Sequence, residues 1–354
     1  MRRALQLLGA VLLVAAAPSG PSFREVRPGV PFVFPRDHGA HPDHRTEWWY
    51  VTGWLDGPGG THRGFQITFF RTATGFGAGS RSAFAPRQIL FAHAALSDPL
   101  VGHLLIGERI AREGLGLARA STTDTDVRID DWTMRRLPNG RFVAHVAGDG
   151  FALEISLHPD QAVLAQGKGG YSRKGPDPRS ASRYYSLPHL GVTGSVTLAG
   201  RTEPVTGTAW LDREWSSSYL PAGGVGWDWT GLNLDDGAAL MAFRVRRLDG
   251  SSLWAGGSWR AADGSVTVLE PQDVVFVPRH RWRSTRTGAV YPVDPVVRVR
   301  LPTGVRSLPL HPLFPDQELD GRKAGSPIYW EGAVMTPGGR GYLELTGYAG
   351  RLRL

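Results

Sequence analysis

The chain has 354 residues, a formal net charge of +8 and no cysteine. Without thiols it forms no disulfide, carries no lipid on cysteine and performs no cysteine catalysis, so its stability must come from apolar burial. Nearly all of its 40 basic residues are arginine, and they are spread along the chain. This spread argues against nucleic-acid binding, although Arg279, Arg281, Arg283 and Arg286 cluster around Trp282.

Residues 1–17 have the pattern of a secretory signal peptide. Arg2 and Arg3 form a charged start, an apolar run follows, and Ala15, Ala16 and Ala17 offer a small-residue cleavage site. We therefore expect a secreted or periplasmic protein. No second apolar run reaches the roughly 18 residues that a membrane-spanning helix needs, so the mature chain is not expected to be an integral membrane protein.

The mature region is composed of short runs of alternating polarity, punctuated by 46 glycines and 26 prolines. In chain order, the predicted strands cover residues 64–70, 127–134, 142–146, 151–157, 191–198, 240–246, 274–277, 296–301 and 341–348. Helical periodicity is weak, and its best short candidates are residues 87–97 and 102–113. The pattern predicts an all-β protein.

An internal repeat divides the chain. Residues 49–57 can be laid over residues 229–237 at an offset of 180, because in both copies a strand that begins at a Trp enters an Asp-Gly turn. We expect two antiparallel β-barrel domains in tandem, residues 23–217 and 218–354, since closure into a barrel removes exposed sheet edges. A barrel of about eight to ten strands can hold one small ligand, whereas a sandwich, which stays open as an alternative, leaves less room.

Histidines and carboxylates are concentrated in residues 34–47. A metal site would require His38, His41 and His44 on one face of a helix, which the intervening glycine and proline oppose. The favoured interpretation is a hydrogen-bonded network of Asp37, His38 and Glu47 that holds a long loop over the first barrel.

A second constellation combines carboxylates with tryptophan. In a strand, Asp212 and Glu214 share one face, and Arg213 and Trp215 share the other. Two carboxyls in an aromatic cavity would raise each other's pKa, so one could stay protonated and donate a proton to an isolated C=C bond. The alternative is a structural ion-pair cluster of Asp212, Arg213 and Glu214 that ties the two domains together. Gly-x-Ser-x-Gly is absent from the chain, which weakens a serine hydrolase interpretation.

These considerations assign candidate roles to twelve residues. Asp212 or Glu214 would donate the proton, and Asp228 or His38 would orient water. The predicted ligand-binding residues are Trp48, Trp49, Tyr185, Trp215, Trp227, Trp229, Tyr329 and Trp330. No metal and no cofactor is expected.

Several motifs taken in order resemble one known family. They cover residues 37–43, 46–53, 185–190, 209–217 and 329–334, and together they are similar to the AttH and carotenoid 1,2-hydratase (CrtC-like) family, often described as secreted hydrolases. The resemblance implies two lipocalin-like barrels and an apolar isoprenoid or lipid ligand. It also implies cofactor-free addition of water to a C=C bond, a lyase reaction. The alternatives are a non-catalytic lipid carrier that works with ABC transporter components, or a hydrolase.

Overall fold

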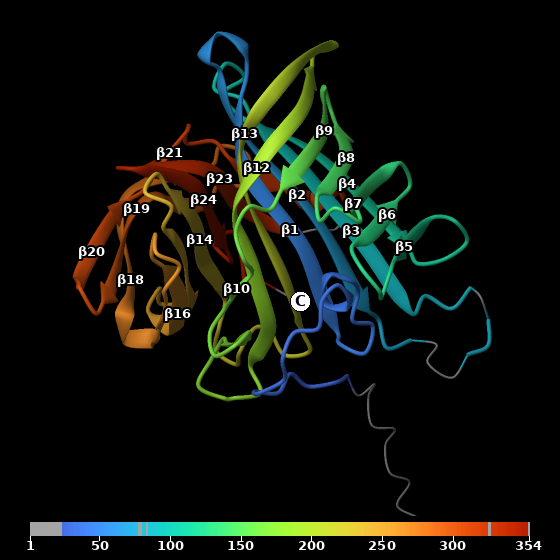
Figure 1. Ribbon diagram of the computed structural model, residues 1–354, viewed down its shortest axis with the longest axis horizontal. Coiled ribbons are helices and arrows are strands. Elements are labelled where there is room, and N and C mark those ends of the chain that lie inside the picture. Colours follow the sequence, from blue (N-terminus) through green and yellow to red (C-terminus); the bar gives the residue numbers. More distant parts are fainter. Residues whose placement is uncertain (1–22, 77–79, 83, 325–326, 353–354) are drawn as a thin grey trace, which may run out of the picture.

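The computed structural model describes residues 23–76, 80–82, 84–324 and 327–352, so the predicted signal peptide lies outside the described residues. The all-β prediction is confirmed, because these residues form 24 strands and no α-helix (Figure 1). Four short 3-10 turns are present as well: η1 (Arg36–His38), η2 (Pro58–Gly60), η3 (Pro271–Asp273) and η4 (Gly321–Ala324). No helix in the described part of the chain is long and apolar enough to cross a membrane.

The first thirteen strands form one antiparallel sheet in the order β4-β3-β2-β1-β13-β12-β9-β8-β7-β6-β5, with β10 and β11 paired to β12. Their bounds are β1 (Thr46–Asp56), β2 (His62–Ala73), β3 (Gln88–Ser97), β4 (Leu104–Arg112), β5 (Ala118–Ala120), β6 (Asp126–Ile129), β7 (Trp132–Arg136), β8 (Phe142–Gly148), β9 (Phe151–His158), β10 (Leu164–Ala165), β11 (Tyr171–Arg173), β12 (Ala181–Leu198) and β13 (Arg201–Ser216).

This sheet curls into a nearly closed barrel, in which β4 packs against β8. The two strands approach so closely that a Cβ on Gly107 would lie 2.7 Å from the carbonyl oxygen of Ala147 and from the Cα of Gly148. A backbone bond from Asp149 to Ile106 joins the same edges. The interior is filled with apolar side chains, so this barrel is a packed core.

The remaining strands build the second domain, which occupies the orange and red side of Figure 1. An antiparallel sheet in the order β17-β16-β15-β14-β24-β23-β21, with β22 beside β23, packs against a smaller sheet β18-β19-β20. The bounds are β14 (Gly226–Leu234), β15 (Ala239–Arg246), β16 (Ser252–Arg260), β17 (Val266–Leu269), β18 (Val274–Arg283), β19 (Val290–Leu301), β20 (Gly304–Pro309), β21 (His311–Pro312), β22 (Glu318–Asp320), β23 (Ile328–Thr336) and β24 (Gly339–Thr346).

Two details of the sequence-based prediction are wrong. The candidate helices at 87–97 and 102–113 are strands β3 and β4. On β3 one face packs in the barrel core and the other faces the second domain, so apolar residues on both faces hide the period of two. The predicted strand at 127–134 is a hairpin of β6 and β7, which turns at Asp130 with a φ of 52°.

The repeat is real in topology but shifted in register. β1 and β14 occupy equivalent places, because each is the fourth strand from one edge of its sheet and each is followed by a hairpin partner. Trp49 nevertheless packs in the core of the first barrel, whereas Trp229 packs between the domains. An offset of 180 residues therefore aligns a side chain that faces the core of its own domain with one that faces away from it.

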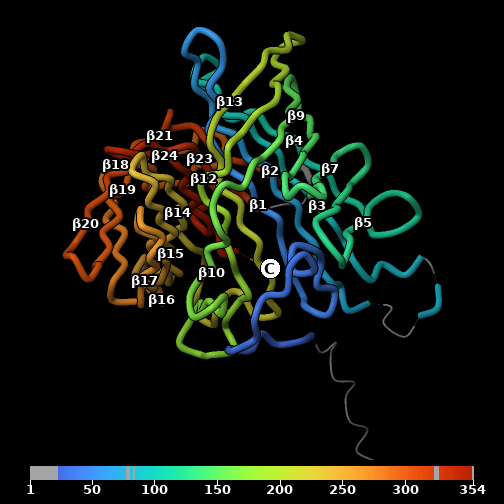
Figure 2. The backbone as a smooth tube through the Cα atoms, in the orientation of Figure 1, coloured from blue at the N-terminus to red at the C-terminus, as the bar shows by residue number. Residues whose placement is uncertain are grey.

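The two domains pack against each other through β1 and β13 on one side and β14 and β24 on the other. A third apolar cluster, which includes Trp54 and Trp210, lies in this seam. β1 lies between the first barrel core and this seam, so it is buried on both faces. The described N-terminal segment, blue in Figure 2, folds against the lower end of β1.

Candidate functional site

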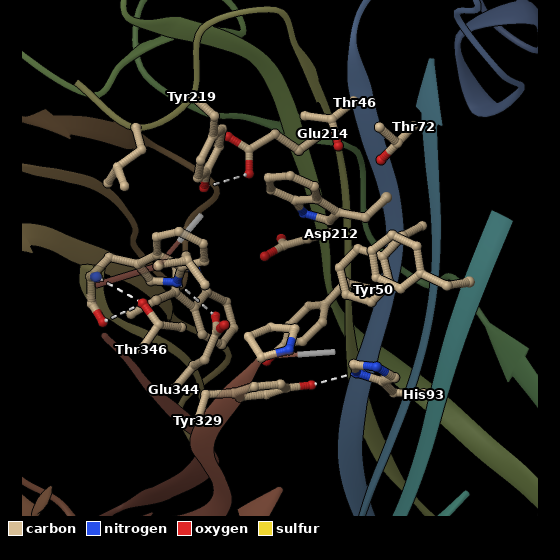
Figure 3. A pocket seen from close by; sticks show the side chains of 18 of the residues that line it. Thr46, Tyr50, Thr72, His93, Asp212, Glu214, Tyr219, Tyr329, Glu344 and Thr346 are labelled. Carbon is tan, nitrogen blue, oxygen red and sulfur yellow. Dashed lines mark hydrogen bonds between the residues drawn. The ribbon is translucent and has the colours of Figure 1, made fainter. Parts of the chain in front are cut away.

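A cavity of about 830 Å³ lies between the two domains (Figure 3). Its wall carries the aromatic residues Trp48, Tyr50, Phe70, Phe91, Tyr184, Tyr219, Trp227, Trp229 and Tyr329, and the carboxyl groups of Asp212, Glu214, Glu331 and Glu344. Figure 3 shows Asp212 near the middle, with Glu214 and Tyr219 on one side and Tyr329 and His93 on the other. This size and this largely aromatic lining suit a drug-sized apolar ligand.

Strand alternation decides which side chains reach the cavity. On β1, Trp48 and Tyr50 face the cavity, while Trp49 between them packs in the first barrel. On β13, Asp212 and Glu214 face the cavity together. The shared face of the two carboxylates is therefore as the sequence predicts.

Half of the twelve candidate site residues line the cavity, namely Asp212, Glu214, Trp48, Trp227, Trp229 and Tyr329. The other six lie elsewhere. Trp49, Tyr185 and Trp215 belong to the first barrel core, Trp330 to the second core, His38 to the loop over the first barrel, and Asp228 to the inner face of β14. Each of these except His38 sits one residue away, along its strand, from a cavity residue.

Asp228 and His38 have partners that keep them from a cavity ligand. Asp228 forms ion pairs with Arg244 and Arg246, both at 2.7 Å. His38 places its Nδ1 2.6 Å from the hydroxyl of Tyr185, and burial lowers the pKa of His38 to about 3. The structure therefore does not place either residue where it could orient water in this cavity.

Asp212 is buried and surrounded by donors. Its Oδ2 accepts a hydrogen bond from the Tyr184 hydroxyl at 2.5 Å, and its Oδ1 accepts bonds from Ser186 at 2.5 Å and from the Trp210 indole at 2.7 Å. Burial raises the pKa of Asp212 to about 7, while these three hydrogen bonds act in the opposite direction and nearby Glu214 adds to the rise. The group is thus poised to gain or lose a proton near neutral pH.

Glu214 has a different environment on the same strand face. It forms an ion pair with the buried Lys174 at 2.8 Å and accepts hydrogen bonds from Ser182 and from Tyr219. The Lys174 ammonium lies 4.4 Å from the ring centroid of Phe243 and near two further aromatic rings. This cation stabilises the Glu214 carboxylate. The two neighbouring carboxyl groups therefore differ in their partners, since Glu214 is paired with a cation and Asp212 is surrounded by neutral donors.

The hypothesis of an Asp212–Arg213–Glu214 ion-pair cluster is not what the structure contains. Arg213 points to the opposite face, pairs with Glu47 and lies 3.8 Å over the ring of Trp49. Arg213 and the two carboxylates are separated by the sheet itself.

A second pair of acids, Glu331 and Glu344, was missed from the sequence. They are direct cross-strand partners on β23 and β24 and both line the cavity. Burial raises the pKa of Glu331 well above its usual value, and the neighbouring Glu344 raises it further. Burial likewise raises the pKa of Glu344 to about 7, and the Trp227 indole opposes this with a bond of 3.0 Å.

Only Glu331 left a signal in the sequence. It alternates with Tyr329 in the motif of residues 329–334, so the two side chains had to share a face. Glu344 stands in an ordinary amphipathic strand, and nothing near it in sequence marks it. Its role depends on the pairing of β23 with β24.

The histidine segment forms a buried network over the first barrel. Glu47 pairs with Arg71 and Arg213, and it accepts two hydrogen bonds from the backbone N–H of His41 at 2.9 and 3.0 Å. The His41 ring stacks on Trp215, with centroids 3.7 Å apart, and its Nε2 lies 3.3 Å from Asp37. In the described part of the chain, no three His, Asp or Glu side chains are grouped as a metal site would require.

Comparison with known proteins places this arrangement in context. The sequence profile of the AttH-like family matches residues 25–348. A crystal structure of a protein described as an AttH from Nitrosomonas europaea is 50% identical, with a TM-score of 0.85, and the match covers 92% of this chain and 99% of that one. No curated protein sequence matches significantly.

More distant solved structures share the fold. Kievitone hydratase from Nectria haematococca is 15% identical with a TM-score of 0.66, over 93% of this chain and 97% of that one. CghA in complex with Sch210972 is 11% identical with a TM-score of 0.53, over 86% of this chain and 90% of the other.

Proposed function

The chain belongs to the AttH-like family, and from this membership and the cavity we propose that it binds an apolar ligand between its two domains and adds water to a C=C bond of that ligand. The observation that carries the proposal is Asp212, a carboxyl group with a pKa raised to about 7 in a cavity walled by aromatic rings. The name of the structurally similar kievitone hydratase agrees with this reaction class.

The reaction needs one acid and one water. Protonated Asp212 donates its proton to one carbon of the double bond, which leaves a cation on the neighbouring carbon. The oxygen of water then bonds to that carbon, and one water proton passes to the Asp212 carboxylate. Asp212 returns to its protonated form, so no cofactor is consumed.

The aromatic walls support the cationic intermediate. Trp229 lies edge-on to Tyr50 at 5.3 Å, and both residues border the space in front of Asp212. Ring faces attract a cation by about 0.5–2 kcal/mol each when water is excluded. Asp212 is the better candidate for the proton donor of the two predicted carboxyls, since Glu214 is engaged in an ion pair with Lys174.

The test begins with the ligand. Denaturing extraction and mass spectrometry of the purified protein would identify a co-purified apolar compound with a C=C bond, and turnover would then be followed in H₂¹⁸O. We expect ¹⁸O in the product, and Asp212→Asn to lower turnover by about 10²–10⁴-fold while ligand binding persists. Glu318→Gln is the matched control, because it alters a buried carboxyl with hydroxyl donors that lies in the second domain outside the cavity.

Two results would redirect the interpretation. Bound ligand without product, in wild type and variant alike, would favour a carrier. Turnover that survives Asp212→Asn would remove this residue from the acid role. We also propose that the protein acts after export, as residues 1–17 indicate, which cell fractionation would test.

A further inference from the structure

Three buried polar atoms in the cavity wall lack a partner at good hydrogen-bond geometry. They are the Tyr50 hydroxyl, Oε1 of Gln66 and Oε1 of Glu331, and of these Tyr50 and Glu331 interact with each other. The three side chains line the cavity and are 7%, 2% and 3% exposed. Buried polar groups are nearly always well paired, so these incompletely satisfied atoms in one wall call for a bound partner.

The strand register brings the three groups together. Tyr50 and Gln66 lie on the same face of β1 and β2, where Gln66 is two residues along β2 from Thr68, the direct partner of Tyr50. Gln66 Nε2 reaches the Tyr329 hydroxyl at 3.4 Å, and Glu331 follows Tyr329 by two residues on the same face of β23. Glu331 is also close enough to Tyr50 that each shifts the pKa of the other. One small group can therefore contact all three.

A chain of side chains orients the Gln66 amide. Nδ1 of His93 lies 2.8 Å from the Tyr329 hydroxyl, and Nε2 of the same ring lies 3.5 Å from Glu108. Burial lowers the pKa of His93 to about 4, so this ring is neutral near pH 7. The Tyr329 oxygen then accepts from Gln66 Nε2, which also donates to Thr68 at 2.9 Å. The Gln66 amide oxygen is left as an acceptor that faces the cavity.

We propose that Tyr50, Gln66 and Glu331 form an oxygen subsite, which holds the water before it adds and the hydroxyl of the alcohol product afterwards. The inference rests on the proposed function. The oxygen of the water becomes the hydroxyl oxygen of the alcohol product. The same subsite can therefore hold this oxygen before and after the C–O bond forms. The Gln66 oxygen accepts an O–H proton in both states. Tyr50 or Glu331 donates to one lone pair of the water, which keeps its other lone pair for the C–O bond, and both groups donate to the product hydroxyl.

The environment of Glu331 agrees with a role as a hydrogen-bond donor. The groups that face it are Glu344 on β24, Tyr329 on β23 and Tyr50 on β1. Burial and the Glu344 carboxyl raise the pKa of Glu331, which favours the neutral form that can donate a hydrogen bond. Tyr50 is the direct cross-strand partner of Asp212, so the bound oxygen lies beside the proton donor. The proton that the water loses has a short path to the Asp212 carboxylate.

The experiment compares two probes that differ by one water. The tertiary alcohol nerolidol and the hydrocarbon β-farnesene are titrated at equilibrium, with binding read from the fluorescence of Trp48, Trp227 and Trp229 in the cavity wall. We expect wild type to prefer the alcohol by about tenfold, the ratio that corresponds to one or two net hydrogen bonds. Tyr50→Phe, Gln66→Leu and Glu331→Leu should each reduce this preference, whereas Glu331→Gln should retain it because an amide still donates.

Controls separate this inference from the proposed function. Tyr291→Phe removes a buried hydroxyl in the second domain, outside the cavity, and should leave the preference for the alcohol unchanged. The melting temperature of Tyr50→Phe should stay close to that of wild type, since the deleted hydroxyl has no partner at good hydrogen-bond geometry, so misfolding would not explain a lost preference. Equal affinity of wild type for both probes would overturn the subsite and leave the hydration proposal standing. Failure of both probes to bind would overturn the apolar cavity proposal and the subsite with it.

Discussion

Asp212 shows how burial and hydrogen bonding oppose each other at a single side chain. Burial favours the protonated form, whereas the donors Tyr184, Ser186 and Trp210 favour the carboxylate. Burial is the stronger influence, so the pKa rises to about 7 instead of falling. Glu47 shows the reverse outcome. It is fully buried as well, but Arg213 and Arg71 hold its pKa far below the usual range.

The raised pKa of Asp212 has a consequence for stability against pH. The folded state binds its proton more tightly than the unfolded chain, so this stabilisation is present below the unfolded pKa of 3.8 and is lost as the pH rises to about 7. The loss has an upper limit of about 4 kcal/mol. We therefore expect the stability difference between Asp212→Asn and wild type to shift in favour of the variant between pH 4 and pH 8.

Urea unfolding at both pH values measures this difference. Asparagine fails to replace some hydrogen bonds of Asp212 at either pH. That loss therefore cancels when the difference in unfolding free energy between variant and wild type is compared at pH 4 and at pH 8. A difference that stays constant with pH would contradict the raised pKa. Glu318→Gln again serves as the control.

At the scale of an element, the loop before β1 is held by charge buried beneath it. Glu47 and Arg213 are fully inaccessible, and Arg71 donates to the carbonyl oxygens of His41 and His44 while pairing with Glu47. Arg213 donates in the same way to the carbonyl oxygen of Gly39. The loop thus contributes backbone acceptors that satisfy two buried guanidinium groups. This explains why so many polar residues in 34–47 build a structural cap.

Glu47→Gln should destabilise the protein strongly. It leaves Arg71 and Arg213 buried with too little negative charge, a loss of about 3–5 kcal/mol in the free energy of unfolding. The effect should be full at neutral pH and should fade as the pH falls toward the depressed pKa of Glu47, where wild type is protonated too. Chemical unfolding would show it. Glu154→Gln, at a carboxyl whose side chain is 71% exposed, should change stability little, and equal effects of the two variants would refute the cap.

At the scale of the whole molecule, the cavity exists because two sheets meet face to face and are joined at one end of it, near Trp54 and Asp56. Trp54 donates its indole N–H to the carbonyl of Gly341 at 3.0 Å, and Arg340 forms two bonds with Asp56 at 2.8 and 2.7 Å. Close approach is also enforced at Gly64, where a Cβ would lie 2.5 Å from that of Ala333. The seam is therefore a packed interface, and the cavity is the part of it that side chains do not fill.

Asn233 provides a test of how far the domains depend on each other. It donates to the carbonyl of Ala209 at 3.1 Å and accepts from the backbone N–H of His189 at 2.9 Å, so it bridges both domains. Asn233→Ala leaves two buried backbone groups unpaired, which costs about 2 kcal/mol or more. We expect lower stability and weaker nerolidol binding, measured by urea unfolding and fluorescence titration. The exposed Asn139→Ala should affect neither, and unaltered binding in Asn233→Ala would show that the cavity does not depend on this bridge.

The sequence by itself determined the all-β architecture and the placement of Asp212 and Glu214 on one face of a strand, because these depend on local periodicity and turn chemistry. It could not determine which face of each strand meets the other domain. That choice separates Trp48 from Trp49 and Asp228 from Trp229.

Only the tertiary structure brought Glu331 and Glu344 beside Tyr50, since the hairpin of β23 and β24 is far from β1 in the chain. The chemistry of the site also depended on it. Whether a carboxyl is protonated at neutral pH follows from its desolvation and its neighbours in space, and neither is encoded in the spacing of residues along a strand.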